Sequence, residues 1–161
     1  MCAWRVTIVA TVLTACSGFL LAILWMDLIF DSQVVFRRNS PDRLPESVLE
    51  SISSYYRRAT TTSRPMGHLI ALVMLILLGA LGFRAALGRD PGWLLVLSAA
   101  LAGGPIVLAL TRTLPNAVRL GRRSGPPSAQ ARVARSILRD HLFCFGCMLA
   151  FLILWVVNDT S

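Results

Sequence analysis

Four long apolar stretches limit what this chain can fold into more than any other feature. The first, 6–26, is uncharged for 21 residues, and as a helix it would rise about 31 Å, which matches the hydrocarbon thickness of a bilayer. We therefore predict an all-α fold, an integral membrane four-helix bundle that forms a single domain. The predicted spans are about 5–30, 66–87, 91–112 and 136–157.

Composition supports a membrane protein over a soluble domain. The chain has 161 residues, 55% of them hydrophobic and only 15% charged, with a mean hydropathy of +0.65. Soluble domains rarely combine these values. The first apolar stretch is longer than that of a signal peptide, so we expect it to be retained as a span. The lipid bilayer is therefore the first expected partner.

The distribution of basic residues predicts the orientation. All 16 are arginines: six lie between the first and second spans, seven between the third and fourth, and three elsewhere. Since arginine concentrates in cytoplasmic loops, both rich connections should be cytoplasmic and both termini outside the cell membrane. The net charge of +8 would also suit nucleic acid, but topology already accounts for its position, so no nucleic-acid partner is expected. A chain with arginine and no lysine indicates a GC-rich, bacterial genome.

The first arginine-rich connection carries a helix signature. Pro45 can open a helix, Glu46 and Glu50 suit its positive end, and Arg57 and Arg58 suit its negative end. Apolar and aromatic residues then recur at helical spacing. They are Val48, Leu49, Ile52, Tyr55 and Tyr56. We predict a short amphipathic helix at the cytoplasmic interface.

Polar residues gather where the four spans reach the cytoplasmic side. They are Asp27, Asp31, His68, Arg112, Asn116, Arg139, Asp140 and His141. Asp27 and Asp31 are four residues apart and share one helical face. Because Asp27 is followed directly by Leu28, Ile29 and Phe30, we expect it to face the bundle interior and to find an arginine or histidine partner. The alternative is that these residues are polar only because headgroups and water surround them.

Three chemistries fit this set of residues. His141 and Asp27 could act as an acid and base pair, with Arg112 or Arg139 stabilising an enolate or phenolate, and this needs no cofactor. Two histidines and two aspartates could instead bind a metal. A haem held between His68 and His141 is the third arrangement.

The function predicted from these patterns is that of an oxygenase or isomerase acting on a hydrophobic small molecule, such as an aromatic polyketide, quinone or sterol-like compound. Asp31, His68 and Arg112 would contact the substrate. The alternative is a non-enzymatic helper of a larger membrane complex, or a homo-oligomer. Small residues recur every four positions on the first span and would allow close helix packing. They are Ala10, Thr14, Gly18 and Ala22.

The motif Cys144-Phe145-Gly146-Cys147 opens a third possibility. Two cysteines at this spacing in a four-span protein resemble the thiol–disulfide enzymes of the vitamin K epoxide reductase type. That resemblance implies a redox pair, Cys144 and Cys147, linked to a quinone. Free cysteines also serve as small packing residues.

A last pattern spans the C-terminal third. Arg112-Thr113-Leu114-Pro115-Asn116, then a polar connection, then Arg139-Asp140-His141 before the final apolar stretch resembles the small anthrone oxygenase-like membrane proteins. The resemblance implies a four-helix bundle, and for some members oxidation of anthrones to anthraquinones without a dedicated cofactor. It nominates Asn116, Arg139 and His141 as site residues.

Overall fold

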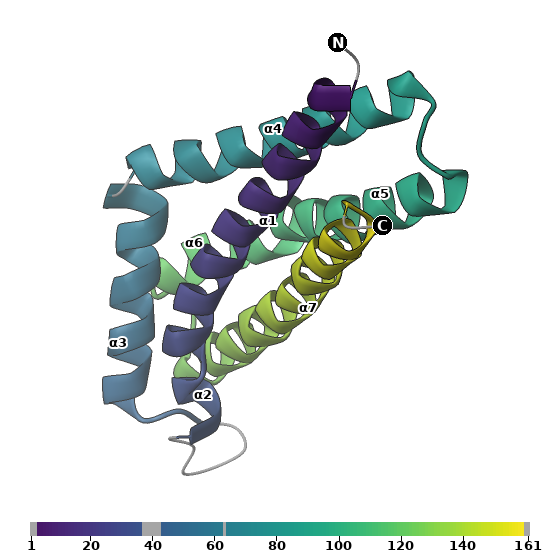
Figure 1. Ribbon diagram of the computed structural model, residues 1–161. Coiled ribbons are helices and arrows are strands. Elements are labelled where there is room, and N and C mark those ends of the chain that lie inside the picture. Colours follow the sequence, from purple (N-terminus) through teal and green to yellow (C-terminus); the bar gives the residue numbers. More distant parts are fainter. Residues whose placement is uncertain (1–2, 37–42, 63, 160–161) are drawn as a thin grey trace.

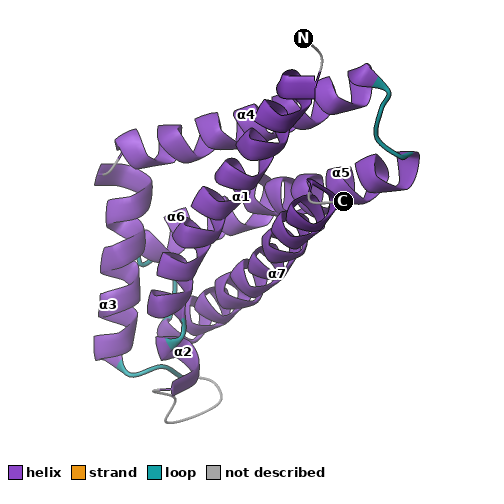
Figure 2. Cartoon of the chain, viewed as in Figure 1, coloured by secondary structure: helices purple, strands orange, loops and turns teal. Residues whose placement is uncertain are grey.

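The computed structural model describes residues 3–36, 43–62 and 64–159 (Figures 1 and 2). These residues form helices joined by short connections, and no strand occurs among them. The α-helices are α1 (Ala3–Asp31), α2 (Gln33–Phe36), α3 (Glu46–Arg57), α4 (Arg64–Leu87), α5 (Gly92–Leu108), α6 (Leu114–Gly121) and α7 (Pro127–Asp159). Two π-helical turns continue them, Arg58–Thr62 after α3 and Ala109–Thr113 between α5 and α6.

Four helical segments are long and apolar enough to cross a membrane, as predicted. They are Thr7–Val35, Pro65–Leu87, Gly92–Gly121 and Pro127–Asn158. The third is longer than predicted because the helix continues from α5 through the π turn into α6. The helix that contains the fourth predicted span begins earlier, at Pro127, and Ala131, Ala134 and Ile137 give its polar first part a buried face.

Two apolar cores follow one another along the helices. The bundle core joins α1, α4, α5 and α7, and comprises Leu13, Leu20, Leu77, Leu81, Leu94, Ala102, Met148, Phe151 and Trp155. The end core joins α2, α3, α6 and the start of α7, and comprises Val34, Leu44, Val48, Leu49, Ile52, Tyr56, Ala117, Leu120, Ala131, Ala134 and Ile137. The chain thus continues beyond its apolar bundle into a second packed layer.

Helix α3 lies across the end of the bundle where α1 stops and α4 begins (Figure 1). Pro45 precedes its first turn and Arg57 closes its last one, so the predicted helix is present. Its apolar face packs onto α6 and α7 within the chain, because Val48, Leu49 and Ile52 are all at most 1% exposed. The helix therefore covers the bundle end.

Contact between α3 and α6 is close enough to require a glycine. A Cβ built at Gly121 would lie 2.8 Å from the backbone nitrogen of Arg57 and 3.1 Å from the carbonyl carbon of Tyr56. These are backbone atoms, which cannot move aside as a flexible side chain would. Gly121 therefore sets how near the two helices approach.

We predict that Gly121→Ala destabilises the protein by about 1–3 kcal/mol, because the added methyl group forces α3 away from α6. Gly82→Ala is the matched control, since its Cβ would meet no atom within 4 Å. Thermal unfolding of the purified protein in detergent, followed by circular dichroism, compares the two. Equal midpoints for both variants would contradict the close approach.

The opposite end of the bundle is fastened by a buried ion pair. Arg84 donates to Asp90 through Nε at 2.8 Å and Nη2 at 2.6 Å, and its guanidinium lies 5.0 Å from the ring centre of Trp155. Trp155 in turn donates to Ser98 at 3.0 Å. Arg84 is only 7% exposed, because a partner carboxylate and an aromatic face are available inside.

Candidate functional site

A layer of polar side chains separates the two apolar cores. Along the chain, Asp27 and Asp31 of α1 come between Leu20 of the bundle core and Val34 of the end core, which lies on α2. On α7, Asp140 and His141 follow Ile137 of the end core. We call this set the polar layer. Its members are Asp27, Asp31, Tyr55, Tyr56, Arg112, Thr113, Asp140 and His141.

Asp31 is the centre of the polar layer and is fully buried at 0% exposure. Its Oδ1 accepts a hydrogen bond from the hydroxyl of Tyr56 at 2.7 Å, and its Oδ2 lies 2.7 Å from Nδ1 of His141. Because a carboxylate accepts, the imidazole donates from Nδ1. The remaining ring nitrogen, Nε2, is then the atom that can take up or release a proton.

Asp27 stands on the other side of the same imidazole. Its Oδ2 lies 3.8 Å from Nε2 of His141, too far for a strong hydrogen bond, and its Oδ1 accepts from Tyr55 at 2.6 Å. The side chain of Asp27, beside Nε2, is 17% exposed, against 0% for that of Asp31, beside Nδ1. The imidazole of His141 is therefore more accessible at its Nε2 edge than at its Nδ1 edge.

Both tyrosines come from α3 and reach the carboxylates from the end of the bundle. Burial raises the pKa of Tyr55, and the charge of Asp27 raises it further. Burial, followed by the charge of Asp31, raises the pKa of Tyr56 in the same direction. Since phenols next to carboxylates resist ionisation, both hydroxyls remain hydrogen-bond donors throughout the physiological range. Phe30 stacks on Tyr55 with ring centres 4.1 Å apart and fixes its orientation.

A second group of the polar layer forms at the π turn before α6. Thr113 donates to Asp140 at 3.4 Å, and Nε of Arg112 lies 3.4 Å from the same carboxylate oxygen. Arg112 also donates to Ser136 at 2.8 Å. Because a π turn adds one residue to a helical turn, it changes which side chains face α7, and here it turns Thr113 inward.

The predicted site residues separate into those inside the polar layer and those outside it. Asp27, Asp31 and His141 come together, and Arg112 pairs with Asp140, the residue that precedes His141 on α7. His68 and Arg139 are exposed and Asn116 is half-buried, and among the described residues no hydrogen bond joins any of them to the layer. Asp27 faces inward as expected; its hydrogen-bond partner is Tyr55 at 2.6 Å, and Nε2 of His141 lies 3.8 Å from its other oxygen.

The metal and haem arrangements both needed His68 beside His141. His68 lies on the exposed face of α4, so the donor set of two histidines and two aspartates is not assembled. Across the described residues, no group of three or more histidine, cysteine, aspartate or glutamate side chains is close enough to hold a metal ion.

Tyr55, Tyr56 and Thr113 were not among the predicted site residues. The tyrosines occupied the apolar face of the predicted helix and were counted with its aliphatic residues. They are nevertheless the only two tyrosines of the chain, and two adjacent phenols on a face that must become buried need acceptors. This need for buried acceptors could have indicated that the tyrosines bond to the aspartates of the site. Nothing in the sequence indicated the π turn that brings Thr113 inward.

The two cysteines of the motif, Cys144 and Cys147, lie on α7 one to two turns after the polar-layer residue His141. Cys144 is buried, with its sulfur 3.9 Å from the carbonyl oxygen of Pro105 in α5, and Cys147 is half-buried. Both are free thiols. The packing of Cys144 against the proline-containing helix α5 accounts for a small side chain at this position.

No family model, curated protein sequence or solved structure matches this chain. The geometry of the polar layer is therefore the basis on which a function can be inferred.

The two tyrosines allow a direct spectroscopic test of the site. We predict that both phenols ionise above the ordinary value of about 10, because burial and the neighbouring carboxylates favour the neutral form. Titrating the ultraviolet absorbance of tyrosinate measures this, since no other tyrosine contributes. The chain unfolded in denaturant is the control and should titrate at the ordinary value. A folded protein whose phenols ionise with the unfolded chain would contradict the two hydrogen bonds.

Proposed function

We propose that this chain is a multi-pass membrane protein with both arginine-rich connections in the cytoplasm. Four apolar helices of sufficient length support the crossing. Thirteen of the sixteen arginines flank the same ends of these helices, and three lie elsewhere, which supports the orientation. The polar layer and α3 are then on the cytoplasmic side, and the Arg84–Asp90 pair is on the outer side.

Labelling of single cysteines with a membrane-impermeant maleimide tests this topology. In a chain whose native cysteines are replaced by alanine, we expect Arg89→Cys to react in intact cells. Ser47→Cys and Arg132→Cys should react only after the cells are permeabilised, because both belong to cytoplasmic connections. Opposite accessibility of Ser47→Cys and Arg132→Cys would contradict the arrangement.

The polar layer supports acid–base catalysis better than any other function considered. The observation that carries this proposal is the 2.7 Å hydrogen bond between fully buried Asp31 and Nδ1 of His141. A carboxylate in this position holds the imidazole in one tautomer and one orientation, which prepares Nε2 for proton transfer. Asp27 faces Nε2 and is the group most able to exchange that proton.

The reaction we infer begins with removal of a proton from an activated C–H or O–H group of a lipophilic molecule. Nε2 of His141 accepts the proton, Asp31 stabilises the resulting imidazolium, and the hydroxyls of Tyr55 and Tyr56 keep both carboxylates oriented. Return of the proton to another atom of the substrate would complete an isomerisation. The same first step would begin a cofactor-free oxygenation, in which dioxygen oxidises the deprotonated substrate and is itself reduced to water, and this is the activity implied by the anthrone oxygenase-like pattern.

A lipophilic substrate suits the surroundings of the accessible edge. Asp27 is neighboured on α1 by Trp25, Met26 and Ile29, which are 59%, 51% and 50% exposed. In a bilayer, apolar side chains with that exposure would face lipid. A compound dissolved in the membrane could therefore reach Asp27 and Nε2 without crossing water.

The two histidines of the chain provide a matched pair of variants. In nanodiscs, we expect the protein to accelerate deuterium exchange into at least one of three probes: anthrone, a hydroquinone and an unsaturated steroid ketone. His141→Gln should lower the rate about 10²-fold or more with the helical circular dichroism unchanged. His68→Gln should leave the rate unchanged, because His68 is exposed and outside the layer. Mass spectrometry of the recovered probe gives the rate. Equal losses in both variants, or no exchange above buffer, would argue against the enzyme.

The non-enzymatic helper remains as a second candidate, favoured by one observation. Ala10 is buried, but Ala22 is exposed and a Cβ on Gly18 would meet no atom within 4 Å. The small-residue stripe on α1 is therefore not filled by another described helix of this chain along its whole length. A second protein or copy could pack there.

A further inference from the structure

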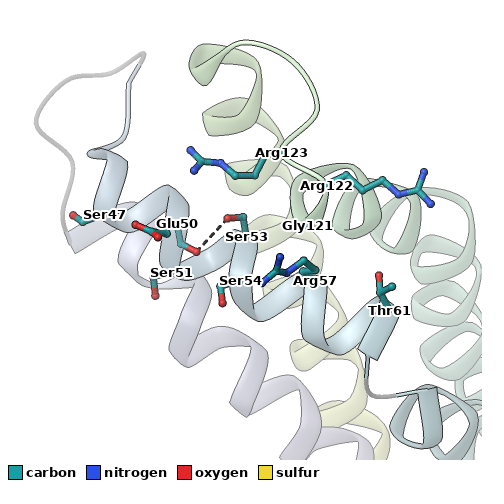
Figure 3. A pocket seen from close by; sticks show the side chains of 10 residues that line it. All are labelled: Ser47, Glu50, Ser51, Ser53, Ser54, Arg57, Thr61, Gly121, Arg122 and Arg123. Atoms are coloured by element: carbon teal, nitrogen blue, oxygen red, sulfur yellow. Dashed lines mark hydrogen bonds between the residues drawn. The ribbon is translucent and has the colours of Figure 1, made fainter.

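The outer face of α3 forms one wall of an open groove of about 830 Å³ (Figure 3). The other wall is the end of α6 and the turn that follows it. The serines come from α3, and the arginines come from the last residue of α3 and from the turn after α6. Ser51 and Ser54 point away from Arg122 and Arg123 (Figure 3). The side chains that matter here are Ser47, Ser51, Ser54, Arg57, Arg122 and Arg123.

Three serine hydroxyls of the groove are available to a ligand. Ser47, Ser51 and Ser54 recur at helical spacing on the face of α3 opposite its buried residues. Ser53 differs, because its hydroxyl donates to the carbonyl oxygen of Glu50 at 3.1 Å (Figure 3). Within the described part of the chain, no comparable side-chain hydrogen bond engages the other three. Each of these hydroxyls can donate to an oxyanion, but Ser47 and Ser54 are about 10 Å apart along the helix and do not reach the same one.

The charge of the groove is positive. Arg57 and Arg122 are exposed, and no carboxylate in the described residues forms an ion pair with either. Glu50 is the single carboxylate among the described lining residues. Arg123 already pairs with Glu46, which joins the turn to the start of α3. Both helices also present C-terminal ends here, whose partial charge is negative, so the arginines must supply the attraction for an anion.

Arg123 occupies a backbone position that favours glycine. Its φ is 52°, in the left-handed region. The turn carries the two hydrogen bonds of a Schellman motif, from Arg123 to Leu120 at 2.9 Å and from Ser124 to Arg119 at 3.1 Å. A side chain there costs about 1 kcal/mol of backbone strain. An arginine at this position lines the groove and pairs with Glu46 at the start of α3, which a glycine could not do.

We propose that this groove binds a phosphate group. Guanidinium groups match phosphate oxygens in pairs, and a neighbouring serine hydroxyl can add a neutral donor. The phosphate could belong to an anionic lipid headgroup or to a soluble phosphate compound. The site is separate from the proposed acid–base site, since it lies on the outer face of α3 while Tyr55 and Tyr56 leave the inner face.

Calorimetric titration of the full-length protein tests the groove with two probes. One arm uses inorganic phosphate in detergent, and the other uses phosphatidic acid added to phosphatidylcholine nanodiscs. The groove variant is Arg57→Gln with Arg122→Gln. The control variant is Arg89→Gln with Arg132→Gln, which loses the same charge at exposed positions that do not line the groove.

The groove variant should bind about tenfold or more weakly than the unmodified chain, and the control should stay within about twofold. Saturable binding of both probes, weakened in the groove variant and not in the control, shows that a free phosphate group suffices. Binding of phosphatidic acid alone with this pattern identifies a lipid headgroup. Absence of saturable binding to either probe overturns the proposal. So does an equal loss in the control variant, because that would reveal general attraction to net positive charge.

Discussion

A buried carboxylate that needs donors from two other helices is the constraint on which this structure depends. Asp31 has no access to solvent, and an uncompensated charge in such a place would cost several kcal/mol. Its two partners are His141 of α7 and Tyr56 of α3. The hydrogen bonds therefore fix how α1, α3 and α7 are placed, and they explain why α3 lies across the bundle end and not apart from it.

Polar contacts between helices stabilise both ends of the bundle, and its middle is apolar. The Arg84–Asp90 pair with Trp155 holds one end, and the polar layer holds the other. In the membrane setting proposed above, the apolar middle would gain little from hydrophobic collapse, so such contacts would carry more of the specificity of packing. The same burial that makes partners necessary for Asp31 also strengthens its interaction with His141, so the cluster that places the helices is also the one proposed to transfer protons.

Local patterns predicted the elements of the fold well. Apolar length alone gave four helices, and Pro45 with the spacing of Val48, Leu49 and Ile52 gave α3. The inward direction of Asp27 also followed from its neighbours in sequence. These predictions succeed because helical periodicity and the cost of burying charge depend on residues only a few positions apart.

The sequence by itself determined which segments are helices, which faces are apolar and that polar residues gather near one end. Only the tertiary structure decided that His141 and not His68 meets the aspartates, that Tyr55 and Tyr56 supply the donors, and that Arg112 turns to Asp140. Those choices depend on which helices are neighbours and how each is rotated about its axis. Rotation is set by packing between distant segments, including the π turn before α6 and the close approach at Gly121, and no local pattern encodes it.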